Sequence, residues 1–229
     1  MTDYKLEAAK AAIEFIQAGQ TIGLGAGTTI SHLITEISLH ADLKKSVTFT
    51  SSSFKTTNKL TEKGFQVQPP AFIKHLAVYF DGCDQFDPEL NALKSGGGIH
   101  TTEKILASVA DEFILVGDES KFASKLDNTY PIAIEILPQA LQVVLHRLSS
   151  DYPDATFNVR ISDKKDGAVI TDNGNLLVDL HLVTIVSPDK LNISLKMIPG
   201  IVDHSLFYRM ATKSIIAGAG GIRIIKPAY

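Results

Sequence analysis

The sequence predicts an α/β protein with a Rossmann-like, mostly parallel sheet, helices on both faces, and a smaller α+β domain with an antiparallel sheet. In the first half of the chain, short apolar runs alternate with helical periodicity, which is typical of parallel strands joined by helices. In the second half, Asn173-Gly174 separates two strand-like runs and favours an antiparallel hairpin. We expect residues 1–128 and 207–229 to form the larger domain and residues 129–206 the smaller, ferredoxin-like one.

The elements of the larger domain follow from local patterns. The first helix is expected to begin after the N-cap Asp3, and its apolar residues recur every three or four positions before Gly19 ends it. The strands expected from short apolar runs are 21–24, 47–50, 76–80 and 112–117. The helices expected from an apolar face are 29–39, 54–63 and 101–110. The stretch 81–98 is expected to be a long functional loop.

The elements of the smaller domain follow a β-α-β-β-α order, which is typical of small α+β folds. The expected elements are a strand at 132–137, a helix at 138–148, a strand at 157–161, two strands within 168–179 and a short helix at 188–197. The last segment, 207–225, is expected to contribute a helix and a strand that return to the first sheet.

Composition and charge exclude several classes of protein. The chain has 229 residues with a formal net charge of −3, which gives no sign of a surface for nucleic acid. Its single cysteine, Cys83, cannot form an intrachain disulfide, and no apolar run reaches the ~20 residues that span a membrane. The charged N-terminus is unlike a signal peptide, and the scattered histidines lack metal-binding spacing. We expect a cytoplasmic protein with no metal, nucleic-acid partner or membrane partner.

The glycine turn G-L-G-A-G-T-T at residues 23–29 can hold an anion. It lies between a strand and a helix, whose first N–H groups carry partial positive charge, and Thr28 and Thr29 add hydroxyl donors. It is not a P-loop, because no Gly-Lys-Ser/Thr follows, and it lacks the third glycine of a dinucleotide fingerprint. By itself the turn is equally consistent with a phosphate site and with a tight turn that binds nothing.

Two carboxylates, Asp81 and Asp84, end the third strand in the stretch F-D-G-C-D-Q. The carboxyl ends of parallel strands are where open α/β sheets bind ligands. Such carboxylates can hold sugar hydroxyls, and their mutual repulsion can raise the pKa of one of them. Taken alone, the pair is slightly better explained by a turn in which an aspartate caps backbone N–H groups.

Three further residues follow the ends of strands. Lys94 begins the run K-S-G-G-G at 94–98, which can surround an oxyanion with N–H groups and an ammonium, although a mobile surface loop explains this run better by itself. Glu103 lies in the first turn of a helix, where the dipole lowers a carboxyl pKa, so a base role requires burial or nearby carboxylates. Lys121 follows the strand that ends near Gly117. The convergence of all these residues on one sheet edge favours an active site.

These residues occur in motifs that resemble the ribose-5-phosphate isomerase A family over almost the whole chain. The matching stretches are G-L-G-A-G-T-T at 23–29, D-G-C-D-Q at 81–85, D-P-E-L-N at 87–91, K-S-G-G-G at 94–98, E-K at 103–104, D-E-S-K at 118–121, T-D-N-G-N at 171–175 and P-G-I-V-D-H-S-L-F at 199–207. Several motifs in the right order and spacing form a specific signal.

The resemblance implies an isomerase that interconverts ribose 5-phosphate and ribulose 5-phosphate in the pentose phosphate pathway without a cofactor. It implies that Glu103 is the general base, that Lys94 stabilises the enediolate, and that Asp81 and Asp84 hold the sugar hydroxyls and assist ring opening. The substrate-binding residues that it implies are Ala26, Gly27, Thr28, Thr29, Gly82, Cys83, Ser95, Gly96, Gly97 and Lys121, with Lys5 near the phosphate. It also implies a homodimer or larger homo-oligomer that associates through the smaller domain.

The chain departs from the family pattern at positions beside the proposed proton-transfer residues. The departures are Cys83 and Gln85 for alanine and glutamate, Ser95 for glycine, Ala26 and Thr28 for threonine and serine, and Thr102 for arginine. They bear on substrate affinity and rate more than on reaction type. Two other functions stay open: a sugar-phosphate sensor without turnover, and an acyl-coenzyme A transferase with Glu103 as nucleophile.

Overall fold

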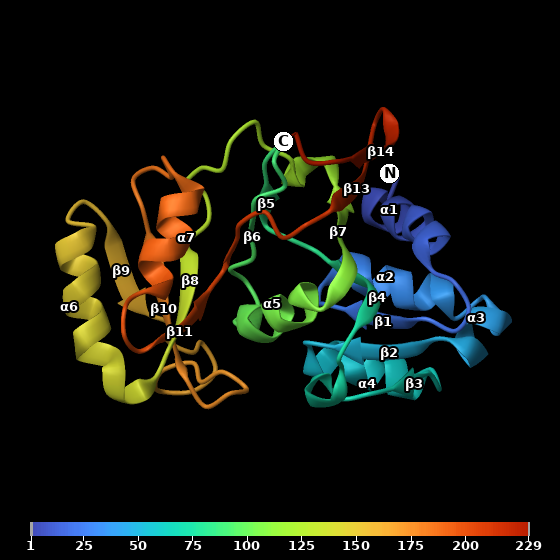
Figure 1. Cartoon of the computed structure of the whole chain (residues 1–229), viewed down its shortest axis with the longest axis horizontal. Helices are drawn as coiled ribbons and strands as arrows, with labels where there is room; N and C mark the ends of the chain where they lie inside the picture. The colour runs from blue at the N-terminus through green and yellow to red at the C-terminus, as the bar shows by residue number, and fades with distance from the viewer. Residues whose placement is uncertain (1, 229) are drawn as a thin grey trace.

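The computed structural model describes residues 2–228, and within them the strands form three sheets (Figure 1). The large sheet has the strand order β14-β13-β7-β4-β1-β2-β3. Its strands are β1 (Thr21–Leu24), β2 (Thr48–Ser51), β3 (Gln66–Val67), β4 (Leu76–Asp81), β7 (Ala110–Asp118), β13 (Lys213–Gly218) and β14 (Gly221–Ile225). Each neighbouring pair is parallel except β13 and β14, which confirms the predicted mostly parallel sheet.

Helices cover both faces of the large sheet, as predicted. Its helices are α1 (Tyr4–Ala12), α2 (Thr28–Ile37), α3 (Ala41–Ser46), α4 (Phe54–Glu62) and α5 (His100–Ser108), with short 3-10 turns at Ile13–Phe15, Pro70–Phe72 and Glu119–Lys121. Because side chains alternate along a strand, Val78 and Phe80 pack against α1 and α2, while Tyr79 packs on the opposite face near α5. The Asp3 side chain caps α1, as expected.

The order of the strands creates a crevice at one edge of the large sheet. The chain leaves β1 for β2 and β3 on one side and returns to β4 on the other side of β1. The connections at the carboxyl ends of β1 and β4 therefore diverge, and open α/β sheets bind ligands at such a switch point. Both the glycine turn and Asp81 follow these two strand ends.

The expected long loop at 81–98 contains two short strands. β5 (Gln85–Phe86) and β6 (Ala92–Leu93) join β12 (Leu206–Phe207) in a connecting sheet with the order β12-β6-β5. Two-residue strands show no alternation that a sequence pattern could reveal. One partner, β12, also lies more than a hundred residues away along the chain. The segment was therefore expected to be a loop for lack of local signal.

The small sheet is antiparallel, as predicted, and has the order β11-β8-β10-β9. Its strands are β8 (Ile132–Ile136), β9 (Thr156–Val159), β10 (Leu176–His181) and β11 (Ile201–His204), and its helices are α6 (Leu141–Asp151) and α7 (Pro188–Lys196), with a 3-10 turn at Pro138–Ala140. The predicted hairpin turn is present, with Gly174 at a φ of 80°. The segment before this turn, residues 168–170, forms isolated β-bridges rather than the expected strand. The strand β11 was not expected.

The predicted helix in the segment 207–225 is wrong. This segment forms β12, β13 and β14. β13 lies inside the large sheet and is buried on both faces, so Ile215 and Ile216 are both buried and the strand lacks alternation. Such an apolar run cannot be told from a helix by its periodicity. None of the helices described for residues 2–228 is long and apolar enough to cross a membrane.

Candidate active site

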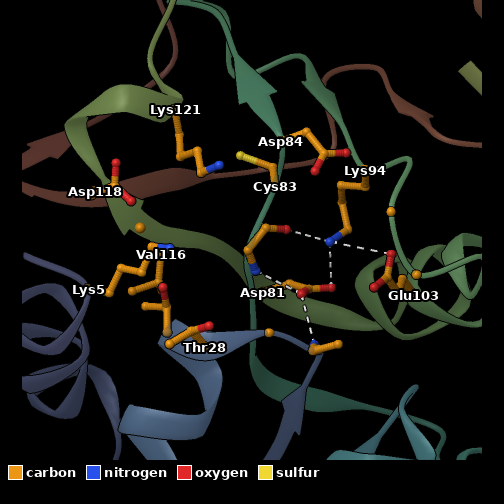
Figure 2. Close-up of a pocket in the computed structure, with 17 residues that line it drawn as sticks. Lys5, Thr28, Asp81, Cys83, Asp84, Lys94, Glu103, Val116, Asp118 and Lys121 are labelled. Atoms are coloured by element: carbon orange, nitrogen blue, oxygen red, sulfur yellow. Dashed lines mark hydrogen bonds and ion pairs between the residues drawn. The ribbon is translucent and has the colours of Figure 1, made fainter. Parts of the chain in front are cut away.

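A cavity of about 330 Å³ opens at the switch point of the large sheet. The predicted site residues that line it are Ala26, Gly27, Thr28, Thr29, Asp81, Gly82, Cys83, Asp84, Lys94, Gly96, Gly97, Glu103 and Lys121, together with Lys5. Figure 2 shows two ends to this cavity: Lys5, Thr28, Asp118 and Lys121 gather at one, and Lys94 and Glu103 lie at the other. The convergence expected at the sheet edge is therefore present.

Lys94 joins two carboxylates at the inner end of the cavity (Figure 2). Its Nζ lies 2.8 Å from Oδ2 of Asp81 and 3.3 Å from Oε2 of Glu103. The Nζ also donates a hydrogen bond to the carbonyl oxygen of Gly82. All three charged side chains are almost fully buried, so their interactions are screened only weakly by water.

Asp81 is held rigidly by its neighbours. Its Oδ1 accepts hydrogen bonds from the backbone N–H of Ala26 at 3.2 Å and of Gly82 at 2.8 Å. Its Oδ2 accepts a hydrogen bond from the hydroxyl of Tyr79 at 2.8 Å. A side chain at Gly25 would collide with this carboxylate, because a Cβ there would lie 1.9 Å from Asp81 Cγ. Sequence reasoning missed Tyr79, which looks like an ordinary core residue in an apolar strand.

Burial raises the pKa of Glu103 to about 8, with help from the Asp81 carboxylate, while Lys94 acts in the opposite direction. The sequence left open whether burial or the helix dipole has the larger effect on the pKa of Glu103. Burial has the larger effect, because the pKa is raised. Burial lowers the pKa of Lys94, but Asp81 and Glu103 together outweigh it and raise that pKa above its ordinary value. Lys94 therefore keeps its charge at neutral pH, and Glu103 can gain or lose a proton close to neutral pH.

The glycine run forms the wall beside Asp84. The backbone N–H of Ser95 donates to Oδ2 of Asp84 at 2.6 Å, and the Ser95 hydroxyl donates to the carbonyl of Pro131. Ser95 is buried and does not line the cavity, whereas Gly96 and Gly97 do. The serine that interrupts the glycine run thus anchors the loop, and its side chain points away from the space that a substrate could occupy.

The outer end of the cavity offers donors for an anion. Gly27 precedes α2 at a φ of 100°, a conformation that favours glycine, and provides no side chain to cap the helix. The first N–H groups of α2 therefore remain available beside Thr28, Lys5 and Lys121. Val116, Gly117 and Asp118, at the end of β7, complete this wall and were not predicted. Their sequence signal is their place at the carboxyl end of a strand, to which Asp118 adds its position in the stretch D-E-S-K.

Two departures from the family pattern have different surroundings. Cys83 is partly exposed at the cavity wall, and burial raises the pKa of its thiol to about 12, so it stays protonated at neutral pH. Gln85 lies outside the cavity, and its side-chain oxygen accepts the backbone N–H of Asp127 at 2.9 Å. Gln85 therefore contributes to the chain's packing rather than to the cavity. Among residues 2–228, no group of three or more His, Cys, Asp or Glu side chains could hold a metal ion.

Comparison with known proteins gives a consistent set of relatives. A family model described as ribose 5-phosphate isomerase A (phosphoriboisomerase A) matches residues 48–221. Ribose-5-phosphate isomerase A of Legionella pneumophila (strain Lens) is 34% identical over 228 residues, which cover 99% of this chain and 100% of the relative. The solved ribose 5-phosphate isomerase A of Methanocaldococcus jannaschii has a TM-score of 0.90 at 32% identity and covers 98% of each chain. A D-ribose-5-phosphate isomerase in complex with phospho-erythronic acid also has a TM-score of 0.90, with 31% identity and 97% of each chain covered.

Proposed function

The chain belongs to the ribose 5-phosphate isomerase A family, and we propose that it interconverts D-ribose 5-phosphate and D-ribulose 5-phosphate in the cavity at the switch point. The observation that carries this proposal is the buried Asp81–Lys94–Glu103 arrangement opposite an end rich in anion donors. A proton next to a carbonyl is weakly acidic. Its removal needs a positioned base and a group that stabilises the negative charge formed on oxygen.

Glu103 is the proposed base. In its ionised form it removes the proton from C2 of the open-chain aldose, and the electron pair of that bond moves toward the C1 carbonyl to give an enediolate. The proton of the C2 hydroxyl passes to the oxygen on C1. The same carboxyl then returns its proton to C1 as the electron pair on the C2 oxygen forms the carbonyl, which leaves a hydroxyl at C1 and the ketone at C2. Burial makes Glu103 a stronger base than an ordinary exposed carboxylate, because it raises the pKa to about 8.

Lys94 is the proposed stabiliser of the enediolate. Its ammonium stays charged beside Glu103, so a positive charge lies next to the site of proton transfer before the reaction begins. The backbone N–H groups around Gly96 and Gly97 can add donors to the same oxygens. Such preformed donors stabilise charge that develops in the transition state without reorganising at the moment of reaction.

Asp81 and Asp84 are proposed to hold the sugar hydroxyls and to assist ring opening. Both carboxylates line the cavity on the side of Lys94, and Asp84 lies close to Cys83 (Figure 2). A carboxylate accepts hydrogen bonds from hydroxyl groups and can exchange a proton with the ring oxygen or the anomeric hydroxyl. The backbone and tyrosine contacts of Asp81 would keep it in place during these steps.

The outer end is the proposed phosphate site. Ala26 to Thr29 present the start of α2, and Lys121 and Lys5 bring positive charge to the same wall. Binding energy from a phosphate far from the reacting carbons can orient C1 and C2 against Glu103. The related isomerase solved in complex with phospho-erythronic acid supports a sugar phosphate as the class of ligand. That ligand combines a phosphate with a carboxylate, which resembles the charge distribution of an enediolate phosphate.

A direct assay tests the proposed function. Purified protein in buffer with a metal chelator is expected to form ribulose 5-phosphate from ribose 5-phosphate, and the same assay across five- and six-carbon sugar phosphates would define its preference. Absence of product would overturn the proposal. Binding of ribose 5-phosphate without turnover would instead favour a sugar-phosphate sensor.

Residues 129–206 are proposed to form a separate domain. This domain is proposed to mediate association into a homodimer or larger homo-oligomer, and the protein is proposed to act in the cytoplasm. Support comes from exposed apolar side chains on α6, α7 and the loop before α7, which are more than half exposed. These side chains are Val143, Val183, Val186, Ile193 and Met197. A contiguous patch of exposed apolar side chains marks an interaction surface. Sedimentation velocity would contradict the proposal if the protein stays monomeric at micromolar concentration.

A further inference from the structure

Glu135 is a fully buried carboxylate that lies outside the cavity. It accepts hydrogen bonds from the hydroxyls of Thr101 and Thr171, the latter at 2.7 Å. The side-chain amides of Asn175 and Asn173 donate to it at 2.8 and 3.1 Å. Burial raises the pKa of Glu135, but these donors outweigh burial and lower it, so the group stays ionised at neutral pH. A buried charge is tolerated only when it is satisfied in this way.

Glu135 occupies the face of β8 that is directed toward α5. Its neighbours Ile134 and Ile136 pack in the core of the small sheet, so the alternation of a strand turns Glu135 to the opposite side. The donors Thr171, Asn173 and Asn175 come from the turn before β10. Thr101, by contrast, belongs to the first turn of α5 and comes from the larger part of the chain.

Thr101 and Glu103 point to opposite sides of the same helical turn. They are two residues apart, and each residue of an α-helix advances by about 100°, so their side chains diverge by about 200°. Glu103 faces the cavity and Lys94, while Thr101 faces the small sheet and Glu135. A shift at Thr101 must therefore be transmitted through the backbone of a single turn to Glu103.

The start of α5 has no side-chain cap of its own at Ile99, so its position depends on contacts with other elements. In Figure 1, α5 lies between the large and small sheets. A second contact from the small sheet is the ion pair between Lys104 Nζ and Asp203 Oδ1 at 2.8 Å. The carboxylate of Glu135 also lies beside the amino-terminal end of α5, where the helix dipole favours negative charge.

We propose that Glu135 is a positioning residue for Glu103: through the hydroxyl of Thr101 it fixes the first turn of α5 and so the place of the Glu103 carboxylate against Lys94 and the reacting carbons. This inference rests on the proposed function, since it requires Glu103 to be the base. The rate of proton transfer is sensitive to changes of a few tenths of an ångström in the distance between the base and the carbon. The Glu103 carboxylate must therefore be held in a fixed position.

Three variants and one matched control test this role by steady-state kinetics with ribose 5-phosphate. Glu135→Ala is expected to lower kcat by about 100-fold and Thr101→Val by about tenfold, with KM within about threefold of the wild type. Glu135→Gln keeps an acceptor of the same shape and is expected to restore most of kcat. Thr171→Val removes one hydroxyl donor from the same carboxylate and the acceptor of the Asn175 N–H, and both hydrogen bonds lie outside α5, so its kcat should stay within about twofold of the wild type.

Circular dichroism and thermal melting show whether each variant is folded. If Glu135→Ala does not fold, the kcat of Thr101→Val is compared with that of Thr171→Val to test the positioning role. Equal losses of kcat in these two variants, or a wild-type kcat in a folded Thr101→Val, would overturn the positioning role. The proposed function and the positioning role of Glu135 can be refuted separately. A wild-type protein without isomerase activity contradicts the proposed function. An active wild type with an inactive Glu103→Gln and a fully active Thr101→Val contradicts only the role of Glu135.

Discussion

Lys94 lies between Asp81 and Glu103 and pairs with both, so the difference between the two carboxylates comes from their other neighbours. The three groups carry a net negative charge when all are ionised, and burial penalises each charge. Asp81 accepts hydrogen bonds from two backbone N–H groups and from the hydroxyl of Tyr79, in addition to its contact with Lys94. Glu103 lacks comparable donors among the contacts described for it and has the raised pKa. Two neighbouring carboxylates with different environments are typical of acid–base catalysis.

The raised pKa of Glu103 predicts a specific pH dependence. The base must be ionised, so kcat/KM should fall about tenfold per pH unit well below pH 8 and level off above it. Lys94 should not limit activity there, because its pKa is raised above the ordinary value. Initial rates at low substrate between pH 5.5 and 9.5 measure this profile. A plateau that extends down to pH 5.5 would show that the functional base has an ordinary carboxyl pKa.

The carboxyl ends of β1, β4 and β7 and the start of α2 together line the cavity. The sequence allowed these elements to be predicted because each has a clear apolar period and a glycine or polar residue at its end. The connecting sheet and β13 could not be predicted in this way. β5 and β6 depend on pairing with the distant β12, and β13 is buried on both faces.

Lys121 tests the contribution of the turn after β7 to substrate binding. Lys121→Ala is expected to raise KM by about tenfold with kcat within about threefold, because a phosphate contact acts in both the ground state and the transition state. Lys125→Ala removes the same charge from an exposed side chain of the following loop and serves as the control. An unchanged KM for Lys121→Ala, or an equal rise in both variants, would contradict a direct contact with the phosphate.

In the whole molecule, α5 lies between two sheets (Figure 1). It carries the proposed catalytic side chain of Glu103, which contacts Lys94 in the cavity at the edge of the large sheet. The meeting of Asp81 and Lys121 was predictable, because the carboxyl ends of the parallel strands β4 and β7 share one edge of the sheet. Lys94 follows the short strand β6 and Glu103 belongs to α5, so this rule does not place them. The hydrogen bonds that hold these residues in place could not be predicted. Tyr79 and Glu135 both lie in apolar strands, and their hydrogen-bond partners are set by tertiary structure rather than by local pattern.

The kinetics of the Glu103→Gln variant show whether Glu103 transfers the proton. The amide keeps the size of the side chain but cannot accept the proton, so the loss falls on the transition state. We expect the kcat of Glu103→Gln to fall by about 10²- to 10⁴-fold, with its KM within about threefold of the wild type. Glu62→Gln, at an exposed position of α4, is the matched control and should keep the wild-type kcat. A Glu103→Gln protein with near-normal kcat would contradict the account.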